Sequence, residues 1–167
     1  MSIVDSPEFD IRYTEEADRV ALKRILMKPE VMRWMVQSKE SEIDPFVQNW
    51  IGFARFKSTL TCLYQGVPIA FGALFLYPYQ KVCHMAMVQM VVDPEYQKRG
   101  VGKSLLRNLI HLAKTRFRFQ SLHIDIPENS PGKKLLEQTG FKLAVQHPDF
   151  YFIDGKYYAR HVMEFVL

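Results

Sequence analysis

The chain has 167 residues, of which 48% are hydrophobic and 24% are charged, and its formal net charge is +4. This length and composition exclude a disordered chain and predict one globular domain, residues 1–167. No apolar run reaches the roughly 18 residues of a membrane span, and the N-terminus lacks the pattern of a signal peptide. Two cysteines make no disulfide framework. We therefore expect a cytoplasmic protein that is not in a membrane.

The first half of the chain alternates extended and helical patterns. We expect strands over 9–13, 59–64, 67–76 and 82–92, and helical segments over 14–27, 30–35 and 45–57. Thr14 is a suitable cap for the first helix, and Asp44 followed by Pro45 predicts the start of the third, as N-cap and first helical residue. Gln65-Gly66 predicts a tight hairpin turn between two of the strands.

The second half has the same mixed character. We expect helices over 101–116 and 131–139, a short strand over 122–126, and a final hairpin of strands 141–152 and 156–166. Apolar residues recur every three to four positions in the longer helix, which predicts one buried face. Ser130-Pro131 starts the shorter helix and Gly140 ends it. Asp154-Gly155 is a strong hairpin signal. The element order predicts a mixed α/β domain.

One segment, residues 91–104, predicts a binding site. A buried strand ends at Val92, the chain turns through Gly100 and Gly102, and an amphipathic helix follows. Glycines let successive backbone N–H groups converge, and the helix adds its unpaired first-turn N–H groups and the positive end of its dipole. Four basic residues lie in or just after the turn: Lys98, Arg99, Lys103 and Arg107. The segment favours a phosphate or pyrophosphate, and the alternative is a plain loop with solvated charges.

Two other interpretations of this segment are less well supported. Gly102-Lys103-Ser104 is similar to the end of a Walker A loop, but that motif needs a glycine where Gln97 stands. The basic residues cluster on a glycine turn and belong to no recognisable nucleic-acid-binding motif. We therefore expect neither a nucleoside triphosphatase nor a nucleic-acid partner, and we expect no metal.

The turn Gln97-Lys98-Arg99-Gly100-Val101-Gly102 resembles the acetyl-CoA loop of the GNAT superfamily, Gln/Arg-x-x-Gly-x-Gly/Ala. The preceding Val-Asp-Pro, the long following helix and the later Glu-Gln-Thr-Gly-Phe at 137–141 also lie where that family places them, so the resemblance covers nearly the whole chain. It implies a GNAT fold, with a mixed sheet of about seven strands, a splayed central strand pair and about four flanking helices.

The resemblance also implies acetyl-CoA as cosubstrate and indicates which residues hold it. The pantetheine arm would pair with the free edge of the splayed strand, at Met90, Val91 and Val92, and Asn129 would contact the same arm. The pyrophosphate would lie against the turn and the start of the helix: Gln97, Lys98, Arg99, Gly100, Val101, Gly102, Lys103 and Ser104.

Two catalytic positions depart from the family pattern. The tyrosine that often protonates the departing thiolate is replaced by Leu136, which leaves Tyr151, Tyr157 and Tyr158 as candidate acids in the final hairpin. The glutamate that some members carry on the splayed strand is replaced by Ala86. His84 lies two residues earlier, hence on the same face of a strand that covers 82–92, and an imidazole there would accept a proton from the amine.

We therefore expect an N-acetyltransferase, monomeric or homodimeric, that moves an acetyl group from acetyl-CoA to a primary amine by direct attack. The acceptor would be a small amine or polyamine, or a protein amino group, since the ending at 154–158 is similar to members that modify such groups. The missing tyrosine and glutamate leave one alternative, a non-catalytic acyl-CoA-binding or interaction module with the same fold.

Overall fold

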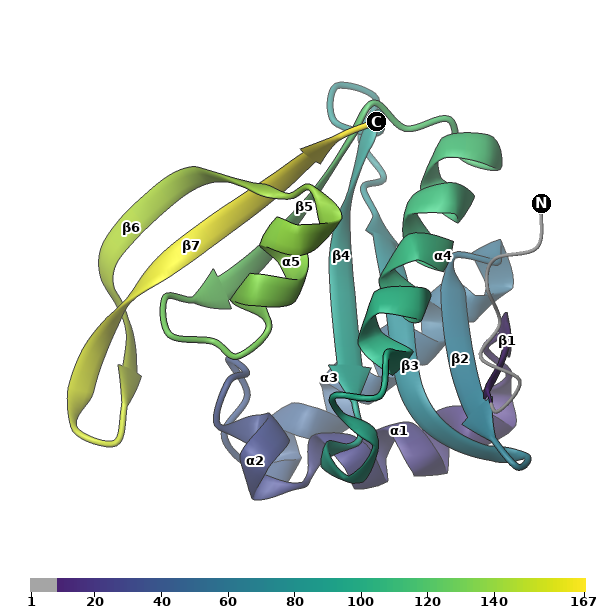
Figure 1. Ribbon diagram of the computed structural model, residues 1–167, viewed down its shortest axis with the longest axis horizontal. Coiled ribbons are helices and arrows are strands. Elements are labelled where there is room, and N and C mark those ends of the chain that lie inside the picture. The colour runs from purple at the N-terminus through teal and green to yellow at the C-terminus, as the bar shows by residue number, and fades with distance from the viewer. Residues whose placement is uncertain (1–8) are drawn as a thin grey trace.

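A seven-stranded mixed sheet organises the fold, which the computed structural model describes over residues 9–167 (Figure 1). The strands are β1 (Phe9–Tyr13), β2 (Thr59–Tyr64), β3 (Val67–Leu76), β4 (Met85–Val92), β5 (Ser121–Pro127), β6 (Lys142–Ile153) and β7 (Lys156–Val166). The helices are α1 (Arg19–Leu26), α2 (Pro29–Met32), α3 (Glu40–Gly52), α4 (Val101–Thr115) and α5 (Lys133–Thr139), with short 3-10 turns at Glu16–Asp18, Phe53–Phe56 and Pro94–Tyr96.

The strand order across the sheet is β1-β2-β3-β4-β5-β7-β6. All neighbouring strands are antiparallel except β4 and β5, which run parallel because α4 connects them. The β6–β7 hairpin extends away from the rest of the molecule (Figure 1). The expected mixed fold of seven strands with a splayed central pair is thus confirmed.

Helices cover both faces of the sheet, and each face has its own core. On one face, α4 and α5 pack on β2 to β5, where Leu105, Leu109 and Leu122 are fully buried. On the other face, α1 and α3 pack on β3 and β4 around Trp50 and Phe71. Because side chains alternate along a strand, β4 contributes Ala86 and Val88 to the first core and Met87 and Val91 to the second.

The predicted start of the first helix is wrong by several residues. Thr14 caps nothing; its hydroxyl lies 2.9 Å from that of Thr61, in a buried polar network. Asp18 lies at the centre of this network and accepts hydrogen bonds from the Arg12 guanidinium at 2.7 and 2.9 Å. The Glu15 N–H also donates to Asp18, so a 3-10 turn precedes α1. Tertiary partners therefore decide this helix start.

Other boundaries also differ from the sequence-based expectation, among them the end of α2 at Met32 and the start of α5 at Lys133. Helix α3 begins at Glu40, because the Glu42 carboxylate accepts from the Ser38 N–H and stabilises an earlier first turn. Pro45 consequently lies inside α3 and not at its first position. Strand β4 begins at Met85, after a turn, so residues 82–84 lie outside it. Among the described residues, no helix is both long and apolar enough to cross a membrane.

Candidate functional site

The sheet is split between β4 and β5. These strands pair only over Met85–Met87 and Ser121–His123, although β4 continues to Val92 and β5 to Pro127. Figure 1 shows the two strands diverging from this short paired segment toward their C-terminal ends. The remainder of β4 is hydrogen-bonded to β3 alone and that of β5 to β7 alone. Each strand therefore presents backbone groups to the gap, and a ligand that pairs with them satisfies their hydrogen bonds.

The turn at the end of β4 is fixed by a buried carboxylate. Asp93 is 2% exposed, and its Oδ1 accepts from the Glu95 N–H at 3.1 Å and from the Lys28 ammonium at 2.7 Å. Lys28 lies between α1 and α2, so this ion pair connects those helices to the turn. The Gln97 side chain folds back and donates to the Val92 carbonyl at 3.2 Å, which closes the turn from the other side.

The turn ends at the N-terminus of α4. Lys98 and Gly100 have φ of 62° and 85°, the left-handed conformation that reverses the chain direction. The first bond of the helix runs from the Ser104 N–H to the Gly100 carbonyl at 3.0 Å. The N–H groups of residues 101–103 therefore point forward from the helix end, into the turn. This arrangement favours an anion.

Gly100 and Gly102 are needed for different structural reasons. A Cβ on Gly100 would meet nothing within 4 Å, so this position needs glycine for its positive φ and leaves its backbone open to a ligand. A Cβ on Gly102 would lie 3.1 Å from the Leu135 side chain and 3.6 Å from those of Met90 and Val92. Gly102 therefore lets α4 pack closely against α5 and β4.

The charge around the turn is positive. Within residues 9–167, none of the four basic side chains Lys98, Arg99, Lys103 and Arg107 forms an ion pair, and all are exposed. The Arg99 guanidinium lies over the Tyr96 ring, 5.4 Å from its centroid. These cations, the free N–H groups and the helix dipole together favour the binding of an anion.

A second group of polar residues lies where β4 and β5 separate. His123 is the β5 residue of the last pair, opposite Met87. Its Nε2 lies 2.8 Å from the hydroxyl of Tyr77, which follows β3, and the two rings are stacked with centroids 5.8 Å apart. Burial lowers the pKa of His123, while the charges of Asp125 and Glu164 oppose that shift. Burial also raises the pKa of the Tyr77 phenol.

Next to this pair, the Arg160 guanidinium of β7 donates two hydrogen bonds to Asp125 Oδ2, at 2.9 and 2.6 Å. Tyr151 is 9% exposed, and burial together with the charge of Asp125 raises its pKa. His123 and Asp125 were not predicted as site residues from the sequence. Their signal was present, because they are the polar residues that alternate with the apolar Leu122, Ile124 and Ile126.

The structure separates the sequence-predicted catalytic residues. His84 is exposed and lies in the turn before β4, so the strand parity that related it to Ala86 does not apply. Ala86 itself points into the core under α4. Tyr157 is 64% exposed and packs on Phe152 at the end of the β6–β7 hairpin. Asn129 lies in the exposed turn after β5, and Leu136 is a core residue, 4% exposed.

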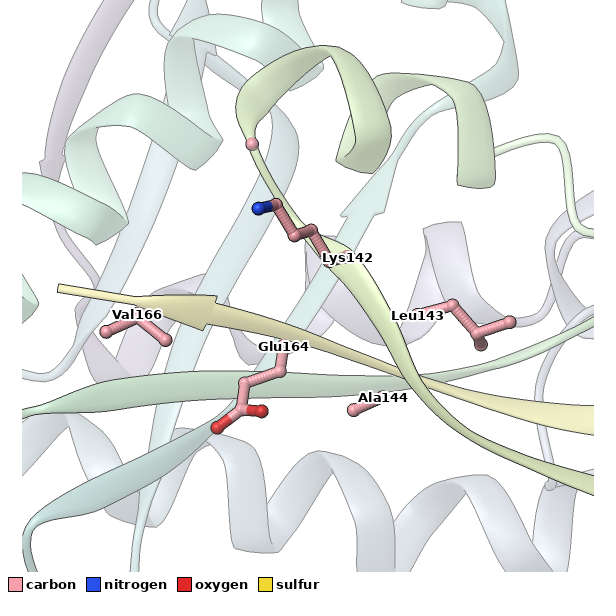
Figure 2. A pocket seen from close by; sticks show the side chains of 6 residues that line it. Lys142, Leu143, Ala144, Glu164 and Val166 are labelled. Carbon is pink, nitrogen blue, oxygen red and sulfur yellow. The ribbon is translucent and has the colours of Figure 1, made fainter.

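A shallow pocket of about 290 Å³ lies between the start of β6 and the end of β7 (Figure 2). It is lined by Gly140, Lys142, Leu143, Ala144, Glu164 and Val166. Figure 2 shows the Glu164 carboxylate on the same side of β7 as Val166. Glu164 is paired with His123 in the register of β5 and β7, so this pocket borders the polar group at the strand separation and contains no part of the glycine turn.

Comparisons with known proteins agree with this geometry. The sequence model of the acetyltransferase (GNAT) family matches residues 19–141. No curated protein sequence matches the chain. A putative phosphinothricin N-acetyltransferase is 21% identical with a TM-score of 0.85, over 96% of this chain and 99% of that one.

Two further solved structures have the same fold. The putative acetyltransferase yncA of Salmonella typhimurium, solved with acetyl-CoA, is 20% identical with a TM-score of 0.79, over 96% of this chain and 94% of that one. A ribosomal-protein-alanine N-acetyltransferase of Brucella melitensis is 20% identical with a TM-score of 0.76, over 95% and 99%.

Proposed function

Because the chain belongs to the GNAT acetyltransferase family, we propose that it moves an acetyl group from acetyl-CoA to a primary amine by direct attack. The observation that carries this proposal is the split sheet that ends at a basic glycine turn. The open backbone edge of β4 leads to the anion site at the start of α4. Together they match a ligand that joins an amide-bearing arm to a diphosphate.

The residues around the gap fit acetyl-CoA. The backbone of Met90, Val91 and Val92 would pair with the amides of the pantetheine arm. The diphosphate would accept hydrogen bonds from the free N–H groups at the start of α4, and Lys98, Arg99 and Lys103 would neutralise its charge. Gln97 would act by holding the turn, since its amide is bonded to the end of β4. Asn129 stays a proposed contact to the arm.

The acceptor would approach from the side of the sheet that carries His123 and Asp125, opposite α4. Acetyl transfer needs a neutral amine close to the thioester carbonyl, and holding the two together supplies much of the rate acceleration. The thioester is already activated. The backbone N–H groups of β4 that face the gap would stabilise the oxyanion of the tetrahedral intermediate. A covalent acyl-enzyme is not part of this proposal.

A direct assay would identify the class of acceptor. Acetyl-CoA would be incubated with phosphinothricin, spermidine and a peptide with a free N-terminal alanine, with release of the CoA thiol and the mass of the product as measurements. Acetylation of the first two supports a small amine, and acetylation of the peptide supports a protein amino group. CoA binding without thiol release for any amine would favour the alternative, a non-catalytic acyl-CoA-binding module.

A further inference from the structure

The point where β4 and β5 separate carries a polar pair from two other segments. Strand β4 has no titratable side chain along Met85–Val92. The last paired residues are Met87 and His123, whose side chains share the sheet face opposite α4. His123 is therefore the first titratable side chain on that face at the closed end of the gap.

Tyr77 reaches His123 across a neighbouring strand. It follows β3, and β4 lies between β3 and β5 in the sheet. The contact of 2.8 Å between its hydroxyl and His123 Nε2 therefore joins segments that are not neighbours in the sheet. Both residues are half-buried. The hydroxyl is thus held at His123, in the last pair of β4 and β5 before the gap opens.

Burial and nearby charges shift the pKa of His123 in opposite directions. Asp125 on its own strand and Glu164 on β7 raise its pKa, Arg160 on β7 lowers it, and the lowering by burial dominates. Tyr77 faces it from the segment after β3. Asp125 is also paired with Arg160, which reduces its effect. The imidazole is consequently neutral near pH 7 and ready to accept a proton.

We propose that Tyr77 and His123 form the proton relay that deprotonates the acceptor amine, a proposal that depends on the acetyl transfer proposed above. The amine N–H breaks and its proton moves to the Tyr77 oxygen, while the Tyr77 hydroxyl proton moves to His123 Nε2. The neutral nitrogen then forms a bond to the thioester carbonyl carbon. Collapse of the intermediate breaks the C–S bond, the departing thiolate takes the second nitrogen proton, and His123 releases the first to solvent.

The relay supplies a proton acceptor that neither β4 nor α5 provides. A lysine-type amine has a pKa of about 10.4 and is nearly all protonated at pH 7. Neither β4 nor the buried Leu136 offers a group that exchanges protons. The relay places such a group on the opposite side of the gap from α5.

The test compares Tyr77→Phe and His123→Gln with the matched control Tyr79→Phe, whose ring is 72% exposed in the same loop. Turnover would be measured with acetyl-CoA and, as probes, spermidine and a peptide with a free α-amino group. Calorimetry with CoA would be run in parallel. We expect kcat to fall about 10²-fold in both variants and to stay unchanged in the control, with CoA affinity unchanged in all three.

The pH profile separates catalysis from structural support. In the wild type, kcat/KM should rise with pH through a pKa below the roughly 6.5 of a free histidine, and His123→Gln should lose this acidic limb. External imidazole should restore part of the turnover of His123→Ala. Normal turnover and an intact acidic limb in folded Tyr77→Phe and His123→Gln would overturn the relay alone. A wild-type protein that binds no CoA would instead overturn the proposed function.

Discussion

Substituting Gly100 tests the proposed diphosphate site and provides its own control. The position has φ of 85° and open space around it, so aspartate and asparagine meet the same backbone strain and no clash. Both residues tolerate the left-handed conformation better than other side chains do. Gly100→Asp and Gly100→Asn therefore differ mainly by one negative charge, placed directly before the free N–H groups of α4.

The magnitude follows from that charge. Two unit charges about 4 Å apart interact by about 1 kcal/mol in water and about 4 kcal/mol at an effective dielectric constant of 20. Gly100 is exposed, so the lower figure applies to each nearby phosphate charge. The aspartate also weakens the positive end of the helix dipole. We expect Gly100→Asp to bind CoA at least tenfold more weakly than Gly100→Asn, which corresponds to about 1.4 kcal/mol.

The assay is titration calorimetry with CoA on both variants, after thermal melts have shown that each is folded. The comparison of the two variants removes the shared cost of the backbone strain. Equal dissociation constants for Gly100→Asp and Gly100→Asn would refute the reasoning, because a negative charge in contact with a bound diphosphate has to weaken binding. The diphosphate would then lie away from this turn.

Four further outcomes are expected. Gly102→Val should lower the melting temperature, because overpacking against α5 costs about 1–3 kcal/mol; an unchanged melt would contradict the close packing seen here. Leu136→Ala should cost about 2–5 kcal/mol in urea unfolding, with unchanged turnover per folded molecule, and a selective loss of turnover would reveal a catalytic role. Hydrogen bonds from Arg12 and its neighbours outweigh burial and lower the pKa of Asp18. The stability that this carboxylate gives is therefore present above the unfolded-state pKa, about 3.9, and is lost as the pH falls through the lower folded-state value. Asp18→Asn should consequently weaken the loss of stability at acid pH. An unchanged loss in this variant would mean that other groups cause it. His84→Ala should keep the wild-type rate and pH profile, whereas a large loss would restore the histidine as the base.

The features that the sequence predicted well are those with local causes. Gln65-Gly66 and Asp154-Gly155 have positive φ and make the hairpin turns expected of them. The glycine turn before the long helix is also where it was expected, with Gly100 as the N-cap of α4. A turn residue acts on its own backbone, so its effect is visible without knowledge of the rest of the fold.

The features that the sequence did not predict depend on distant partners. The start of β4 is set by where β5 pairs with it, which moved His84 out of the strand. Tyr77 and His123 are isolated polar residues in their own segments and become a pair only when β3, β4 and β5 are placed side by side. Burial, which shifts their pKa values, is likewise a property of the assembled sheet.

The split between β4 and β5 gives the sheet edges of two kinds. The outer edge at β6 is interrupted by two register shifts, and such irregularities discourage pairing with another chain. The inner edges, on β4 beyond Met87 and on β5 beyond His123, lie within the width of the sheet, next to α4 and α5 (Figure 1). Folding alone would gain hydrogen bonds by closing this gap. Each strand is instead held by its other neighbour, β4 by β3 and β5 by β7, and so both keep backbone groups open for hydrogen bonds to a ligand.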